Sequence, residues 1–433
     1  MQINIKQRLS YNFLEMASVI VAAVTIPFTR ASLSIWLGLG IFRVIHIMAA
    51  ILILFFMVRD KQRVSGQFFK ILCAFLAIGT IQVILALFFS DRQALAFREF
   101  LLGFLSPCII LLFLSTRKHL QSYFFYSFFL SYTIFLIIVL ALLFYKDRET
   151  LFNVFKQKNG LTGLIFLRYC YDMYFLRFFG NVNSSTNYLT LALLIAPIIL
   201  TGGKRYKKLL LMLFFVASIV VIVLVYTRAA WLLLPFIVII HFKLWWKALL
   251  FVSLSLLTVT IAFEREKTIP ELNVIYQYLV HAKIKTTPSP GFLGTMNKRF
   301  SQWRELPEII AQNNLPVYRI VLHGIGFDQY SLLKKYKNRD SKTHNLFIDH
   351  FLANGIFVLF IILWLLYKGL RISYEQKQWV CFIGFIIFFL LCFHDYDFCR
   401  LSSINVGSYL FLFLFWPLFH GPGISEQKAL KET

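Results

Sequence analysis

The sequence is poor in charged residues, and poorest in acidic ones. Charged side chains make up 15% of the 433 residues, and 20 Asp and Glu stand against 44 Lys and Arg. Hydrophobic residues make up 59% of the chain and include 49 Phe. A soluble core could not hide that much apolar side chain, so the composition excludes a soluble globular protein and indicates an integral membrane protein.

Motifs of nucleotide and metal chemistry are also missing. The chain contains no phosphate-binding loop, no Rossmann glycine pattern and no His-Glu-x-x-His motif. Its six Cys show no metal-type spacing and are typical of small packing residues. We therefore expect no cofactor, no metal, no nucleotide and no nucleic-acid partner. Any reaction must use a substrate that is already activated.

Long apolar runs predict the fold, because each can cross about 30 Å of hydrocarbon as a helix. The alternating strands of an outer-membrane barrel, an internal repeat and the paired interrupted helices of an inverted-repeat transporter are not evident. We expect one all-α integral membrane domain over residues 1–433, a bundle of about twelve transmembrane helices. The predicted spans are 11–29, 33–57, 69–89, 96–115, 121–145, 186–201, 209–226, 229–242, 246–263, 345–367, 379–393 and 403–419.

The distribution of Lys and Arg predicts the orientation. Basic residues concentrate in the connections on the side of the N-terminus, which places both termini in the cytoplasm. Two long segments, 146–185 and 264–344, then face outward, and the second is predicted to be partly helical. It carries 13 basic and 7 acidic residues. A basic surface at the outer membrane face suggests an anionic lipid-linked partner such as a pyrophosphate, or simple contact with anionic membrane lipids.

Three arginines are candidates for holding such an anion. Arg228, in "YTRAAW", lies in a tight outer turn between two apolar stretches. A guanidinium there can hold two phosphate oxygens, or it can snorkel at the interface beside Trp231. Arg299 and Arg304 flank the apolar stripe of a predicted amphipathic helix in "NKRFSQWRELPEII". That helix either presents cations to the outer leaflet or is an ordinary interfacial helix.

The loop 264–344 contains two further candidate features, a glycine-rich turn and a histidine. In "HGIGFDQY", Gly324 and Gly326 predict a turn that allows a tight backbone approach. His344 lies where a polar stretch becomes apolar, in the expected first helical turn at the outer interface. An imidazole there suits a general base at neutral pH, or it only caps or snorkels. His350 falls on a different helix face and is an unlikely metal partner, and Asp349 is a weaker site candidate.

Taken in order, these pieces resemble the O-antigen ligase family, within the superfamily of O-antigen ligases and polymerases. The family pattern is His, then Asn, Ser or Gln, nine residues, Gly, two residues, and Gly, Thr or Tyr. His344, Asn345 and Gly355 match it, whereas Val358 departs at the last position. The "YTRAAW" and "NKRFSQW" runs are similar to the family's arginine motifs. The stretches 179–197, with Asn187, and 393–401, with Arg400, are similar in order and position.

The resemblance implies a metal-independent, inverting glycosyltransferase of the bacterial inner membrane, with its active site on the periplasmic face. The implied donor is a polysaccharide on undecaprenyl pyrophosphate, and the implied acceptor is a sugar hydroxyl of the lipid A core. His344 would be the catalytic base, and Arg228 and Arg299 would bind the pyrophosphate. Additional candidate site residues are Arg304, Asn345, Asn187 and Arg400.

Two other functions remain open at the level of sequence. An O-antigen or exopolysaccharide polymerase would use the same donor, but the Arg-to-Gly spacing of eleven that describes polymerases occurs only from Arg92 to Gly103, in a different loop. A lipid or polysaccharide transporter would need ionisable groups inside the spans. Apart from Arg43 and His46, the span interiors are expected to be nearly bare of them.

Overall fold

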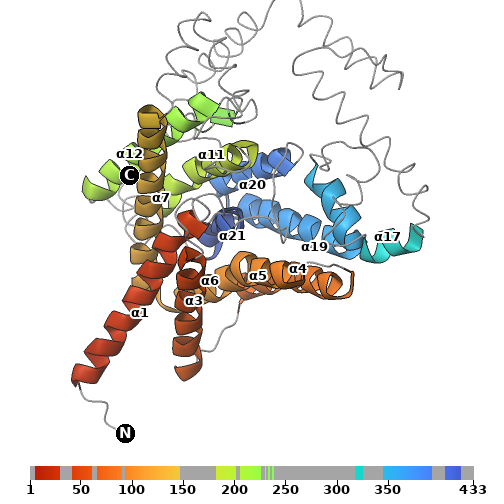
Figure 1. Ribbon diagram of the computed structural model, residues 1–433, viewed down its shortest axis with the longest axis horizontal. Coiled ribbons are helices and arrows are strands. Elements are labelled where there is room, and N and C mark those ends of the chain that lie inside the picture. The colour runs from red at the N-terminus through yellow and green to blue at the C-terminus, as the bar shows by residue number, and fades with distance from the viewer. Residues whose placement is uncertain are drawn as a thin grey trace, which may run out of the picture.

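The described part of the chain is helical throughout and contains no strand (Figure 1). The computed structural model describes residues 5–29, 41–60, 66–89, 93–146, 182–200, 205–225, 317–324, 345–392 and 405–420, with a few single positions between 230 and 237. Its elements are α1 (Ile5–Thr25), η1 (Ile26–Thr29), α3 (Ile41–Arg59), α4 (Gln67–Phe89), α5 (Gln93–Phe100), η2 (Leu101–Leu105), α6 (Ser106–Thr116), α7 (Lys118–Lys146), α11 (Val182–Ile199), α12 (Arg205–Val225), α17 (Val317–His323), α19 (Leu346–Glu375), α20 (Trp379–Cys392) and α21 (Asn405–His420).

Six candidate spans in this part of the chain are long and apolar enough to cross a membrane. They are Tyr11–Phe28, Ile41–Arg59, Gln67–Phe88, Gln93–Thr116, Lys118–Ala141 and Leu346–Glu375. The all-α class and the first five and the tenth predicted spans are thus confirmed as apolar helices of sufficient length. Helices α11, α12, α20 and α21 lie where the sixth, seventh, eleventh and twelfth spans were predicted.

The rest of the predicted layout stays a prediction. The span 246–263 falls entirely outside the described residues, as do most of the segment 146–185 and most of the span 229–242. Within 264–344 the structure describes only α17 and Gly324. The total of about twelve spans is therefore open.

Helix α21 occupies the centre of the bundle. All of its side chains from residue 406 to 418 are buried, so the helix is apolar on every side rather than along one stripe. It packs against α11, α20 and α19 and also meets α4 and α6. Helix α3 is the opposite case, since one of its faces is exposed and apolar along Val44, Met48, Ile51, Phe55 and Val58. That spacing forms a continuous stripe, as expected for a helix that faces lipid.

A chain of hydrogen bonds crosses the apolar interior and joins three helices. The Thr25 hydroxyl of α1 donates to the Val21 carbonyl at 2.8 Å and lies 2.9 Å from Nδ1 of His46 on α3. The hydroxyl of Tyr409, on α21, lies 3.3 Å from Nε2 of His46. A neutral imidazole has one donor and one acceptor nitrogen, so the His46 ring can hydrogen-bond to both hydroxyls at once. All three side chains are buried. Their hydrogen bonds pair polar groups that would be costly to bury without a partner.

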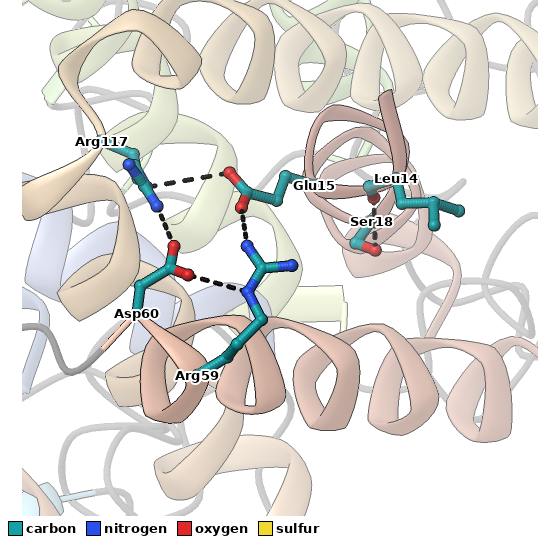
Figure 2. A network of polar contacts seen from close by, with 6 residues as sticks. All are labelled: Leu14, Glu15, Ser18, Arg59, Asp60 and Arg117. Atoms are coloured by element: carbon teal, nitrogen blue, oxygen red, sulfur yellow. Dashed lines mark hydrogen bonds and ion pairs between the residues drawn. The ribbon is translucent and has the colours of Figure 1, made fainter. Parts of the chain in front are cut away.

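A network of four charges ties the middle of α1 to the ends of α3 and α6 (Figure 2). The buried Glu15 carboxylate pairs with Arg59 at 3.0 Å and with Arg117 at 3.7 Å. Asp60 accepts from Arg59 at 2.8 Å and also pairs with Arg117. The structure thus joins Arg59, the last residue of α3, and Arg117, which follows α6, through two shared carboxylates.

A second charged group lies at the other end of α3. Arg98 pairs with the buried Glu99 at 2.8 Å, and Arg43 lies within electrostatic reach of both. The π-helical η2 follows two residues after Glu99 in the same span. With Glu15, these groups place ionisable residues near the ends of two spans, while Arg43 is one of the two ionisable residues expected inside a span. Such residues are retained because partners on the same or neighbouring helices compensate them.

Replacing Arg59 by Gln should destabilise the protein more than replacing Glu15 by Gln. Loss of Arg59 leaves the buried Glu15 carboxylate with Arg117 alone, at a cost of up to about 3 kcal/mol. Loss of Glu15 leaves two guanidinium groups that are 32% and 31% exposed and can turn to water. The measurement is the thermal unfolding midpoint in detergent, with Arg371→Gln, which breaks an exposed pair with Glu375, as the unshifted control. Equal losses for the two network variants would contradict this asymmetry.

The network should also make stability depend on pH. The hydrogen bond from Arg59 holds the pKa of Asp60 below its ordinary value, and the charge of Arg117 adds to the effect. The pKa of Asp in an unfolded chain is about 3.9. The stabilisation by the Asp60 carboxylate is therefore fully present above about pH 4 and is lost as the pH falls through the lower pKa of the folded state. The gap in unfolding midpoint between wild type and Asp60→Asn should therefore be largest near neutral pH and shrink in acid. A gap that stays constant down to about pH 2 would rule this out.

Candidate functional site

The candidate site is built on the first part of α19, which begins next to His344 in the chain. Asn345 has an extended backbone, and its side-chain oxygen accepts hydrogen bonds from the amides of Phe347 and Ile348 at 3.0 and 3.3 Å. This is N-capping, which satisfies amide groups that the first helical turn cannot pair. The helix therefore begins at Leu346, and His344, which lies outside the described residues, directly precedes the cap in the sequence.

Helix α19 is broken at Gly355. The backbone there has φ 74° and ψ −172°, a conformation that is open essentially to glycine alone. The break separates residues 346–354 from the longer part that follows. A break inside a span frees backbone groups that must be satisfied by protein, so such breaks are tolerated only where protein or a wet cavity surrounds them. The predicted span 345–367 is thus a helix that is interrupted at Gly355.

The end of α17 packs directly against this first part of α19 (Figure 1). Gly324 follows the last residue of α17, has φ 72°, and donates its amide to the Ile320 carbonyl at 3.0 Å. A Cβ on Gly324 would overlap the backbone of Ala353 and Asn354. The predicted turn with a tight backbone approach is thus confirmed at Gly324, whereas Gly326 lies outside the described residues.

Three polar side chains are buried just before the break, at Asp349, His350 and Asn354. The Asn354 amide nitrogen lies 3.1 Å from Nδ1 of His350. Because an amide NH₂ group donates, the ring accepts at Nδ1 and carries its proton on Nε2. Buried polar groups in a span are expensive and are typical of functional sites.

The other site residues predicted from the sequence divide into two sets. Asn345 and Asn187 are described and buried, the first as the cap of α19 and the second on α11, which packs against α20 and α21. Outside the described residues lie His344, Arg228, Arg299, Arg304 and Arg400. The catalytic base and the arginines of the proposed pyrophosphate site thus remain predictions.

Sequence reasoning set His350 aside and overlooked Asn354. A signal was available, because the two residues are four positions apart, on one helix face, and Gly355 follows directly. A polar pair followed by glycine inside an apolar run indicates a break better than either residue does alone. Among the described residues, no group of three or more His, Cys, Asp or Glu side chains could hold a metal ion.

No protein-family model and no curated protein matches this chain. The chemistry of the site therefore has to be argued from its residues. The described geometry provides a capped helix of residues 346–354, a glycine-only break behind it, and buried polar groups between the two.

Replacing Gly355 by Ala should destabilise the protein, because alanine disfavours this backbone conformation by about 1–3 kcal/mol. The expected result is a lower thermal unfolding midpoint in detergent. Phe357→Ala is the control, since it removes a large side chain two residues further on that is 57% exposed. We expect the control to change the midpoint much less. A Gly355→Ala protein as stable as wild type would show that alanine adopts the backbone conformation at position 355 without strain.

Proposed function

We propose that this protein is an O-antigen ligase of the bacterial inner membrane. It would transfer polysaccharide from undecaprenyl pyrophosphate to a sugar hydroxyl of the lipid A core, on the periplasmic face, with both termini in the cytoplasm. Six apolar helices long enough to span a membrane are consistent with two lipid-linked substrates. A pyrophosphate leaving group makes a nucleotide site unnecessary.

The strongest support comes from the first part of α19. The pattern that the sequence shares with ligases is His, Asn, nine residues and Gly, and its two described positions both have structural roles. Asn345 caps the helix, and Gly355 ends residues 346–354 in a conformation reserved for glycine. Asn and Ser, two of the three residues that the pattern accepts after the His, are among the best N-caps. The shared pattern therefore covers a capped helix that ends at Gly355, and its His directly precedes the cap in the sequence.

The proposed reaction is a single inverting displacement. His344 takes the proton from the acceptor hydroxyl while the hydroxyl oxygen attacks the anomeric carbon of the donor sugar. The bond from that carbon to the pyrophosphate oxygen breaks, and undecaprenyl pyrophosphate leaves with the electron pair. Arg228 and Arg299 stabilise the negative charge that develops on it. Holding both lipids in one membrane plane orients the reacting groups.

A transporter is a second candidate, favoured by the break in α19 and by the buried polar groups beside it. Broken helices with polar residues near the break are typical of transport sites as well. A polymerase, which accepts a second lipid-linked repeat, shares the donor chemistry. The products that accumulate without the protein distinguish the three.

A deletion strain tests the function directly. For a ligase, we expect bare lipid A core together with accumulated lipid-linked polymer. Core that carries one repeat unit would indicate a polymerase instead. Lipid-linked saccharide that stays inaccessible from the periplasm would indicate a transporter.

Point variants test the assigned roles. His344→Ala should lower transfer by about 10²–10⁴-fold, because it removes the general base. Arg228→Ala should lower it by about 10²–10³-fold, because it removes a cation from the leaving group. The readout is polysaccharide-capped lipid A core in the complemented strain, normalised to protein in the membrane. Two exposed residues, His119 on α7 and Arg205 on α12, supply alanine controls with unchanged transfer. Wild-type capping in His344→Ala would refute its role as base.

A further inference from the structure

Residues 346–354 form a short helix whose two ends are defined by different means. Asn345 caps its start and Gly355 ends it. A helix of that length is about 13 Å long and short enough to move as one rigid body. Its direction is therefore set at the Gly355 end, and the cap at Asn345 lies at the far end. A tilt of about 5° at the break would displace the cap by about 1 Å over that length.

The Gly324 turn limits this tilt from one side. Its backbone packs against the backbone of Ala353 and Asn354, the last residues before the break, with no room for a Cβ. A backbone-to-backbone contact lacks flexible side chains that could yield. It therefore holds the end of the short helix more firmly than a contact between side chains would.

The His350–Asn354 hydrogen bond acts at the same end. Both side chains are buried, and the bond joins the last helical residue before Gly355 to the residue one turn earlier. An apolar pair would fill the same space without the cost of burying an imidazole and an amide. A satisfied polar pair has directional geometry that an apolar pair lacks, so it selects one arrangement of the turn that leads into the break.

We propose that Gly324, His350 and Asn354 are positioning residues that fix the tilt of residues 346–354 and, through it, the place of His344. This inference rests on the proposed function, because it assigns the three residues to the reaction for which His344 is the base. A displacement of about 1 Å of a catalytic group can cost up to about 10²-fold in rate. Loosening the break should therefore slow transfer without removing the base.

The test is steady-state kinetics of purified full-length protein. Lipid-linked polysaccharide and bare lipid A core, both isolated from the deletion strain, serve as the substrates. Asn354→Ala and His350→Leu should lower kcat by about 10- to 100-fold and leave KM for the donor unchanged. His350→Gln, whose amide oxygen can still accept from Asn354, should recover much of the loss. The ascending limb of the kcat–pH profile should keep its wild-type midpoint, because the base is unchanged.

Ser373→Ala provides the matched control. Ser373 is also buried in α19, and its hydroxyl donates to the carbonyls of Gly369 and Leu370 at 2.7 and 2.9 Å, but it lies beyond the break. Its loss should leave kcat unchanged. If the His350 and Asn354 variants lower only the yield of folded protein, with wild-type kcat per folded molecule, their role is merely structural and the inference fails.

Two further outcomes separate this inference from the proposed function. Loss of the ascending pH limb in His350→Gln would make His350 the base itself and overturn its positioning role. Full activity of His344→Ala would instead overturn the mechanism proposed above. An inactive His344→Ala beside fully active Asn354→Ala and His350→Leu would overturn the positioning role alone.

Discussion

A polar group carried into the apolar interior of this bundle needs a partner within the protein, because no water is there to replace one. The buried Glu15 carboxylate meets arginines at the ends of two other spans, and His46 on α3 meets Thr25 of α1 and Tyr409 of α21. Apolar faces can slide past one another, whereas these polar pairs define which helices meet and in which register along their axes. The few charges of the sequence therefore have an influence on the arrangement out of proportion to their number.

The same constraint gives the break in α19 its meaning. A helix interrupted inside a span must have its freed backbone groups satisfied, and the surroundings of Gly355 are accordingly polar and tightly packed. Gly324 brings a second backbone against the break, and the His350–Asn354 bond lies one turn before it. Such an arrangement is costly for simple anchoring in lipid. Its cost is understandable where one residue, His344 in our proposal, has to be held in a defined place.

Several site features followed from the sequence because they depend on local chemistry. The composition predicted membrane helices, because long apolar runs can cross a bilayer only as structures that satisfy their own backbone. The turn at Gly324 followed from the freedom of glycine to adopt positive φ. Asn345 was selected for its resemblance to a shared pattern, and its capping geometry supplies the physical reason for an Asn at that position.

Other features could not be predicted, because they depend on which helices become neighbours. The pairing of Glu15 with Arg117 joins residues about a hundred positions apart, and the chain contains no local trace of it. The role of Gly355 was hidden for a similar reason, since a glycine in an apolar run is compatible with a continuous helix until the packing of Gly324 against Ala353 and Asn354 is known. The sequence by itself determined that the chain is helical and apolar enough for a membrane, because each helix satisfies its own backbone. Only the tertiary structure decided where a helix breaks and which buried polar groups meet, because those depend on contacts between distant segments.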